Sequence, residues 1–334
     1  MAVPAAAGYH DGLTPPRSHE RPDRWAGGTR ALTRVNLHLL RIFVAVAERR
    51  SFSRAAEALF ISQPAVSKAI RELERQLDLP LIEREVGGAR GVRPTDGGQA
   101  LLEHARGIFA LERAAAEDIR ARLGLKRGRL TVGASTTIAG YWLPSYVAEF
   151  MAGRPAIELE IQTANTRAVS QALIECRMDL ALVEGAVEDP RILATHWRDE
   201  ALCIVAHSGS ALARKPRPTF VDLDTQIWLM REPGSGTREV TERWMTACGI
   251  TRARQMIFGS NEGIARAVAG GCGISMLPAR VVTGLLAAGT VKEVRFTSAP
   301  PPLRPLYLLQ LKERPLSPLA RAFINTLQDP LEES

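Results

Sequence analysis

The chain has 334 residues and a formal net charge of +7 at pH 7, long enough for two or three domains that each bury a hydrophobic core. Excess positive charge favours a polyanionic partner without identifying one. No apolar run is long enough to span a membrane, and the N-terminus lacks the continuous apolar stretch of a secretory signal. We therefore expect a cytoplasmic protein without a membrane partner.

Residues 1–34 differ in composition from the rest of the chain. They are rich in proline, glycine, arginine and histidine and show no hydrophobic period, which predicts a disordered extension. Two explanations stay open. The segment is either a basic arm that reaches DNA or the product of a misassigned start codon, in which case translation begins at Val35.

Two short helices around a tight turn are predicted between Ser51 and Leu77. Ser62 is well placed to cap the second helix, and Pro64 suits a first turn, where its missing N–H is not needed. Apolar residues at helical spacing face inward, and the opposite face is polar and basic. The inward residues are Val66, Ile70, Leu73 and Leu77, and the outward residues are Gln63, Ser67, Lys68, Arg71 and Arg75. This pattern fits a helix-turn-helix that enters the major groove, although an ordinary amphipathic helix pair is the alternative.

The flanking segments favour DNA binding. A helix carrying Leu40 and Phe43 precedes the pair, and a glycine-rich basic turn at Gly87–Gly98 fits a two-stranded wing. The segment resembles the winged helix-turn-helix of LysR-type transcriptional regulators in the stretches LHLLRIFVAVAERRSFSRAAEALFISQPAVSKAIRELERQL, LIER and RGVRPTDGG. The resemblance implies a DNA-binding domain at residues 35–95 and a double-stranded DNA operator with dyad symmetry.

The DNA contacts are expected to divide into two kinds. Gln63, Ser67 and Lys68 should reach base edges, while basic and small polar residues around them should hold phosphates. The full set of predicted DNA-binding residues is Ser53, Gln63, Pro64, Ser67, Lys68, Arg71, Arg84 and Arg93.

Residues 96–125 are predicted to form one long linker helix. Its apolar residues follow a heptad-like spacing that has no evident partner in its own domain, so a second copy of the helix could cover them. These residues are Leu101, Ala105, Ile108, Ala115 and Ile119. The resemblance implies a homodimer or homotetramer and leaves RNA polymerase open as a further partner. The alternative is a helix that packs only on its own domain.

From residue 129 to about residue 330, short β-branched runs alternate with helical stretches, which predicts a mostly parallel α/β domain. The predicted strands are 130–135, 157–163, 179–185, 202–207, 227–232, 273–277, 291–296 and 305–311, and a final helix covers 317–328. The resemblance implies an effector-binding domain with two lobes, like a periplasmic binding protein, that the chain joins by two crossings. The expected fold class is therefore α+β multidomain.

Two segments look suited to bind an anion. Ser135, Thr136 and Thr137 follow a predicted strand and open a helix, where hydroxyls and free backbone N–H groups converge. The sequence GSGT repeats that arrangement further along the chain, with Ser235, Gly236 and Thr237. Each segment alone could be a helix cap, but the pair predicts an anion site.

Short motifs also resemble the LysR branch that governs sulfur assimilation, sulfite response and carbon fixation. These motifs are ASTTIAGYWLP, QTANTR, DLALVEG and LMREPGSGTR. The resemblance adds Asn165 and Glu184 to the effector site and implies a small anionic metabolite as effector, with no cofactor. Glu184 would repel an anion unless Arg231 or another cation offsets its charge.

No catalytic machinery is visible in the sequence. The six histidines do not cluster at metal-ligand spacing, and no phosphate-binding loop or nucleophile motif occurs. The four cysteines are far apart and are expected to be small core residues, although Cys272 could be a redox sensor. The alternatives to an effector-responsive regulator are an enzyme or ligand carrier built on the α/β lobes and a purely architectural DNA binder.

Overall fold

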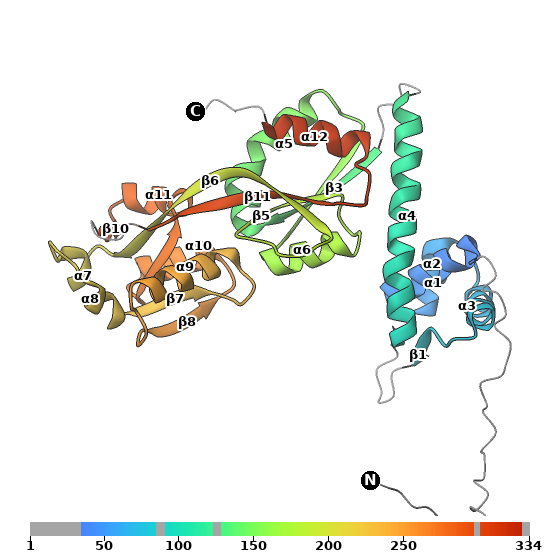
Figure 1. Ribbon diagram of the computed structural model, residues 1–334, viewed down its shortest axis with the longest axis horizontal. Helices are drawn as coiled ribbons and strands as arrows, with labels where there is room; N and C mark the ends of the chain where they lie inside the picture. The colour runs from blue at the N-terminus through green and yellow to red at the C-terminus, as the bar shows by residue number, and fades with distance from the viewer. Residues whose placement is uncertain (1–34, 85–90, 123–127, 297–300, 329–334) are drawn as a thin grey trace, which may run out of the picture.

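The computed structural model describes residues 35–84, 91–122, 128–296 and 301–328. The predicted extension at 1–34 and the tip of the wing lie outside these residues, as does the side chain of Arg84. Figure 1 shows a small helical domain, a long helix α4 beside it, and a larger α/β domain on the other side of that helix.

The N-terminal domain is a winged helix-turn-helix, as predicted. Its elements are α1 (Leu37–Arg49), α2 (Phe52–Leu59), α3 (Gln63–Leu77), β1 (Ile82–Arg84) and β2 (Val92–Pro94). Asn36, Ser51 and Ser62 each cap the following helix through a side-chain oxygen that accepts a backbone N–H. The core includes Leu40, Phe43, Val66 and Leu73, all fully buried. The strands β1 and β2 pair antiparallel and form the base of the wing.

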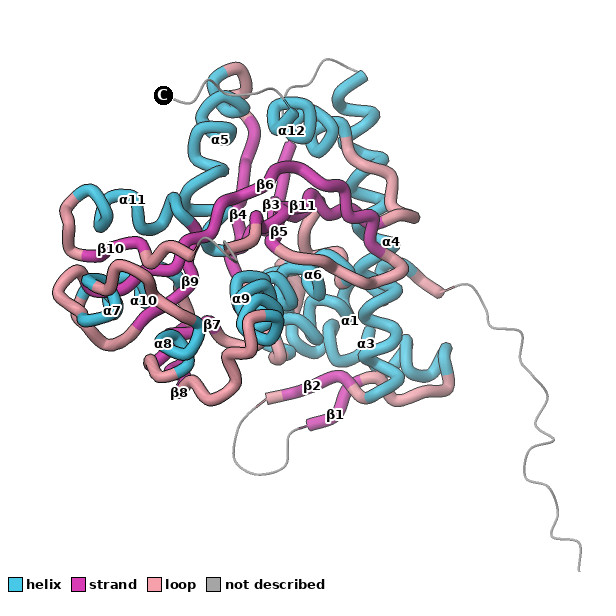
Figure 2. The backbone as a smooth tube through the Cα atoms, turned by 60° about the vertical axis from the view of Figure 1, so that its left-hand side comes forward, coloured by secondary structure: helices cyan, strands magenta, loops and turns pink. Residues whose placement is uncertain are grey.

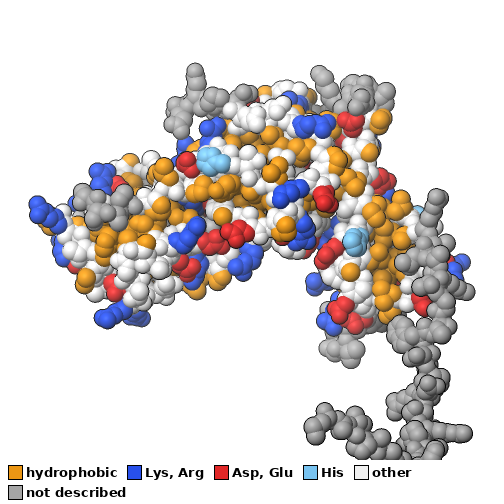
Figure 3. All heavy atoms as spheres, in the orientation of Figure 1, with side chains coloured by type: hydrophobic (Ala, Val, Ile, Leu, Met, Phe, Trp, Pro, Cys, Tyr) orange, Lys and Arg blue, Asp and Glu red, His pale blue; other side chains and the backbone are white. Residues whose placement is uncertain are grey.

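Helix α4 spans Asp96–Arg122, close to the predicted linker helix. The first half of its apolar stripe packs within its own chain, because Leu101 and Ala105 join the core of the winged domain. The prediction that the stripe lacks a partner in its own domain is therefore wrong for this half. Ile108 and Ile119 remain 39% and 58% exposed. Figure 3 shows hydrophobic side chains gathered along α4 on the visible face.

The α/β domain contains two lobes joined by two long strands. Strands β6 and β11 run antiparallel through the middle of the mixed sheet, whose order is β4-β3-β5-β11-β6-β9-β7-β8, with β10 beside β6. The strands are β3 (Gly128–Ser135), β4 (Ile157–Ala164), β5 (Leu180–Glu184), β6 (Ile192–His207), β7 (Ile227–Arg231), β8 (Arg254–Phe258), β9 (Ile274–Pro278), β10 (Val291–Glu293) and β11 (Leu303–Leu311). Figure 2 shows β6 and β11 as the connection between the two lobes.

Helices cover both lobes. Lobe I, around β3, β4 and β5, carries η1 (Ile138–Trp142), α5 (Leu143–Ala152), α6 (Thr166–Ile174) and α12 (Pro318–Gln328). Lobe II, around β7, β8 and β9, carries α7 (Ala211–Arg214), α8 (Phe220–Asp224), α9 (Gly236–Ala247), α10 (Asn261–Ala269) and α11 (Ala279–Ala287). Within the described ranges, no helix combines the length and apolar character that crossing a membrane requires.

The prediction of a mostly parallel sheet is wrong, because β6, β10 and β11 pair antiparallel with their neighbours. The predicted strands themselves are confirmed, with three differences. Strand β6 begins at Ile192 and not at Leu202, because it crosses from one lobe to the other. Strand β10 ends at Glu293, three residues before the predicted end. Strand β8 was not predicted, because it lies at the sheet edge and its residues Arg254–Met256 are exposed on both faces, so it lacks the alternating pattern of a half-buried strand.

Candidate functional site

The exposed face of α3 carries a chain of hydrogen bonds one helical turn apart. The amide of Gln63 donates from Nε2 to Ser67 Oγ (2.9 Å), and Arg71 Nε donates to the backbone oxygen of Ser67 (3.3 Å). Because i and i+4 residues lie on one face of a helix, these three predicted DNA-binding residues are brought together. The amide of Gln63 and the hydroxyl of Ser67 can each donate and accept hydrogen bonds.

The other predicted DNA-binding residues lie on neighbouring exposed positions. Ser53, Pro64 and Lys68 are exposed. Arg93 in the wing pairs with Glu83 on the opposite strand, at 2.7 Å between Nε and Oε1. Both side chains are largely exposed, so this ion pair is weak and can exchange for a phosphate.

A second candidate site lies where the two lobes meet. Strand β3 leads into a helical turn at Thr136, and β7 leads into α9 at Gly236, as predicted. A Cβ atom at Gly236 would lie 2.1 Å from the carbonyl oxygen of Glu184, so only glycine lets the start of α9 approach the end of β5 this closely. The side chain of Ser135 caps the next turn through Ile138 N, whereas Ser235 makes no capping bond.

Asn261 at the start of α10 connects the predicted threonines of both lobes. Its Nδ2 donates to Thr137 Oγ1 at 2.7 Å and to Thr237 Oγ1 at 3.4 Å. Asn261 is fully buried, and its Oδ1 has no hydrogen-bond partner among the described residues. A buried polar atom without a partner is costly, which is a reason to expect a ligand or water beside it.

Glu184 is 2% exposed, and a fully buried arginine offsets its charge. Arg304 on β11 pairs through Nη1 with Glu184 Oε1 at 3.2 Å and also donates to Thr237. Its Nη2 pairs with Glu200 on β6, which in turn accepts from Trp142. The cation that the sequence analysis required beside Glu184 is therefore Arg304 and not Arg231.

Arg231 lies on the same site from the lobe II side. It is 3% exposed, its Nη1 lies 3.4 Å from Thr136 Oγ1, and its other two nitrogens bind Glu232 at 2.8 and 2.9 Å. Asn165, the cap of α6 in lobe I, donates to Glu232 across the lobes at 3.2 Å. Burial raises the pKa of the Glu232 carboxyl, but hydrogen bonds from Arg231 outweigh it and hold the pKa below its usual range.

The structure thus brings predicted effector residues of both lobes into two hydrogen-bonded groups. One group joins Thr136 and Asn165 through Arg231 and Glu232, and the other joins Thr137, Thr237 and Glu184 through Asn261 and Arg304. The side chains of Ser135 and Ser235 are bonded into neither group among the described residues. The sequence analysis did not select four members of these groups: Glu200, Glu232, Asn261 and Arg304. Arg304 had a usable signal, because it is a charged residue at the start of an apolar strand. For Asn261, the sequence offered no signal beyond its place at the start of a helix. A network of hydroxyls and guanidinium groups across two lobes is suited to hold an oxyanion.

Two family models match the chain. The model described as "Bacterial regulatory helix-turn-helix protein, lysR family" matches residues 37–99, and the "LysR substrate binding domain" matches residues 123–332. A RuBisCO operon transcriptional regulator from Allochromatium vinosum is 31% identical over 86% of this chain and 94% of its own length. The matched families describe transcriptional regulators and not enzymes.

Two solved structures support the fold. Full-length OxyR C199D from Pseudomonas aeruginosa covers 88% of this chain and 95% of its own, with a TM-score of 0.70 and 23% identity. The regulatory domain of CcmR from Synechocystis PCC6803, solved in complex with 2-PG, is 27% identical with a TM-score of 0.55. It covers 60% of this chain and 96% of its own.

Proposed function

Because the chain belongs to the LysR family of DNA-binding transcriptional regulators, we propose that it reads its operator through α3 and responds to a small oxyanion held between the two lobes. The effector residues in this proposal are Ser135, Thr136, Thr137, Asn165, Glu184, Ser235, Gly236 and Thr237, joined by Arg231. The protein acts in the cytoplasm, as a homodimer or homotetramer.

The contact between Thr136 and Arg231 is the observation that carries this proposal. It places a hydroxyl from lobe I and a buried guanidinium from lobe II beside one another. Arg231 is held by the carboxylate of Glu232, which is itself an anion and is 27% exposed on its side chain. The Glu232 carboxylate can rotate towards solvent. A free oxyanion can then take its place beside the buried guanidinium.

Displacement of Glu232 supplies a route from binding to conformational change. The same carboxylate accepts from Asn165 in lobe I, so an anion that takes its place also removes one bond between the lobes and makes new ones. A ligand shifts a conformational equilibrium only through a difference in its affinity for the two states. Contacts from both lobes to one oxyanion provide such a difference.

The ligand class follows from charge and size. Sulfate, sulfite or a phosphorylated metabolite would satisfy hydroxyl, backbone N–H and guanidinium donors together. The similarity to the CcmR regulatory domain bound to 2-PG supports a small phosphorylated acid. We expect micromolar to millimolar affinity, or about 4–8 kcal/mol of binding free energy, as befits a metabolite sensor.

Calorimetry on the full chain tests the site against a panel of sulfate, sulfite, inorganic phosphate and 2-phosphoglycolate. Thr136→Val keeps the side-chain shape and deletes one donor, so it should weaken binding of the best ligand by about 0.5–3 kcal/mol. Thr246→Val is the matched control, because Thr246 is exposed on α9 and its hydroxyl donates to the backbone oxygen of Glu242 in the same helix. Equal affinity in wild type and Thr136→Val would place the ligand elsewhere.

A further inference from the structure

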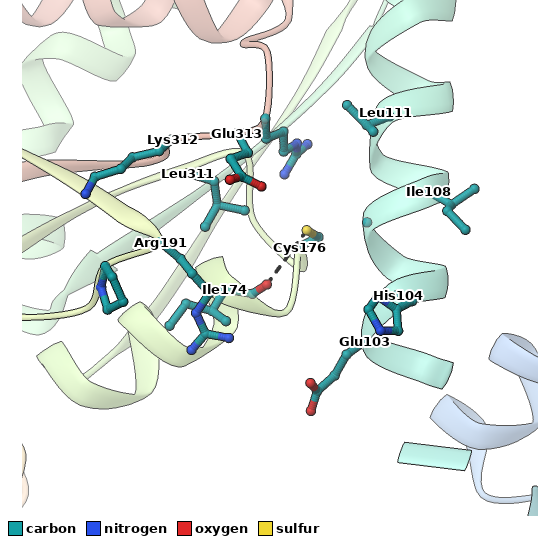
Figure 4. Close-up of a pocket in the computed structure, with 13 residues that line it drawn as sticks. Glu103, His104, Ile108, Leu111, Ile174, Cys176, Arg191, Leu311, Lys312 and Glu313 are labelled. Carbon is teal, nitrogen blue, oxygen red and sulfur yellow. Dashed lines mark hydrogen bonds between the residues drawn. The ribbon is translucent and has the colours of Figure 1, made fainter. Parts of the chain in front are cut away.

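The winged domain and α4 meet lobe I along a loosely packed seam. One cavity of about 520 Å³ separates α4 from lobe I, with Leu111 on one side and Cys176 and Arg191 on the other, as Figure 4 shows. A second cavity of about 600 Å³ is lined by α1, α4 and the end of α6. Spaces of this size mean that few apolar contacts hold the two parts together here.

Arg106 on α4 bridges this seam. Its Nε lies 3.2 Å from Glu48 Oε1 on α1, in the DNA-binding domain, and its Nη1 lies 3.2 Å from Glu175 Oε2 on lobe I. Arg106 is only 14% exposed and Glu175 only 18%, so their ion pair is better shielded from water than an ordinary surface pair, whereas Glu48 is 40% exposed. One side chain on α4 therefore contacts both the DNA-binding domain and lobe I.

Glu175 is well positioned and ionised. It directly follows α6, and the chain turns there through Cys176, whose φ of 55° lies in the left-handed region. Burial raises the pKa of Glu175, but hydrogen bonds from Gln171 and Arg177 outweigh it and leave the pKa lowered. The carboxylate is therefore charged at neutral pH and remains a partner for Arg106.

A separate attachment lies further along α4. Asp118 is 3.6 Å from Arg321 on α12, and Glu117 is buried and hydrogen-bonded to Ser317. Arg106 lies beside the first cavity, and Glu117 and Asp118 lie about one and a half to two helical turns beyond its last α4 residue, Leu111. Among the described residues, lobe I is thus held to α4 at two places along the helix. Releasing one point would let lobe I pivot about the other.

We propose that Arg106 is an interdomain latch: by binding Glu48 and Glu175 together, it fixes the orientation of the effector domain relative to the DNA-binding domain. Its role is positional, because it acts through its two carboxylate partners and touches neither the predicted DNA-binding residues nor the effector residues. The orientation of lobe I therefore depends on whether Arg106 is paired with both Glu48 and Glu175.

Hydrogen exchange on the full chain without added ligand tests the latch. Arg106→Gln should speed exchange of the amides of Cys176 and Arg177 and of the last turn of α1 by about threefold or more, as expected when a shared network is broken. Small-angle scattering of the same variant should show a larger radius of gyration. Arg106→Lys keeps the charge but not the two-pronged geometry, so it should restore these values in part.

Two comparisons separate a latch from local support. Arg41→Gln is the matched control, because Arg41 joins α1 to Glu112 on α4 without touching lobe I. This change should leave the exchange rates of the Cys176 and Arg177 amides unchanged. Glu48→Gln combined with Arg106→Gln should be no worse at the last turn of α1 than Arg106→Gln alone, since both changes remove the contact between Glu48 and Arg106.

The proposal is overturned if Arg106→Gln alters exchange on one side of the seam only, if scattering is unchanged, or if the effects of Arg106→Gln and Glu48→Gln on the last turn of α1 add. None of these measurements requires an effector, so a failed anion test leaves this result interpretable by itself.

Discussion

Gln63 and Arg71 are expected to make different kinds of DNA contact, although both bond to Ser67. Gln63→Ala should cost about 1–3 kcal/mol and relax sequence preference at one base pair. Arg71→Ala should weaken all sequences alike and reduce the slope of log affinity against log salt by about one. Binding to an operator selected from random DNA, measured at several salt concentrations, checks both. Unchanged affinity and preference in Gln63→Ala would contradict base reading by α3.

Glu232 is expected to compete with the effector for Arg231. Glu232→Gln keeps the shape of the side chain and removes the charge, so the guanidinium loses its internal anion. The oxyanion that binds best should therefore bind tighter to this variant, by about two- to tenfold, the range of an ordinary charge-assisted bond difference. Calorimetry measures it, with exposed Glu149→Gln as control. Weaker binding would mean that Glu232 supports the ligand directly.

At the scale of elements, α4 is the expected dimer seam. Ile108 and Ile119 of the predicted stripe are exposed in the single chain, and a second copy of α4 would cover them. Ile108→Asp would place an unpaired charge in that seam at a cost of several kcal/mol. Nearly all of this variant should therefore sediment as monomers. Val221→Asp, on a 73% exposed residue of lobe II, should leave the assembly unchanged. An intact dimer in Ile108→Asp would place the seam elsewhere.

The attachment of α4 to α12 should depend on pH through Glu117. Burial raises the pKa of this carboxyl above its ordinary value of 4.5, against an opposing hydrogen bond with Ser317. The folded chain therefore holds this proton more tightly than the unfolded chain, and that stabilisation is lost as the pH rises through the folded pKa. Glu117→Gln should raise the melting temperature at pH 7 and lose its advantage towards pH 4. Equal differences at both pH values would show that the carboxyl is not desolvated.

At the scale of the whole molecule, the features that could be predicted from the sequence are those set by neighbouring residues, such as helix caps and apolar helix faces. The cap at Ser62 and the apolar spacing of α3 are local, and the structure confirms them. The Glu184–Arg304 pair joins β5 to a strand far along the chain, so only the tertiary fold could reveal which cation meets Glu184. The burial of Ala105 likewise depends on how α4 packs against α1, which a heptad pattern alone does not specify.

The late position of β11 has a consequence for synthesis on the ribosome. Lobe I begins at Gly128, but its sheet closes only when β11 pairs with β5, and α12 follows still later. At roughly 5–20 residues per second, the winged domain emerges and can fold on the order of ten seconds before the effector domain is complete. A nonsense mutation between β5 and β11 would therefore release a protein able to occupy DNA but unable to sense a metabolite. Such truncated alleles should be dominant over the intact gene wherever the linker helix still pairs with a full-length subunit.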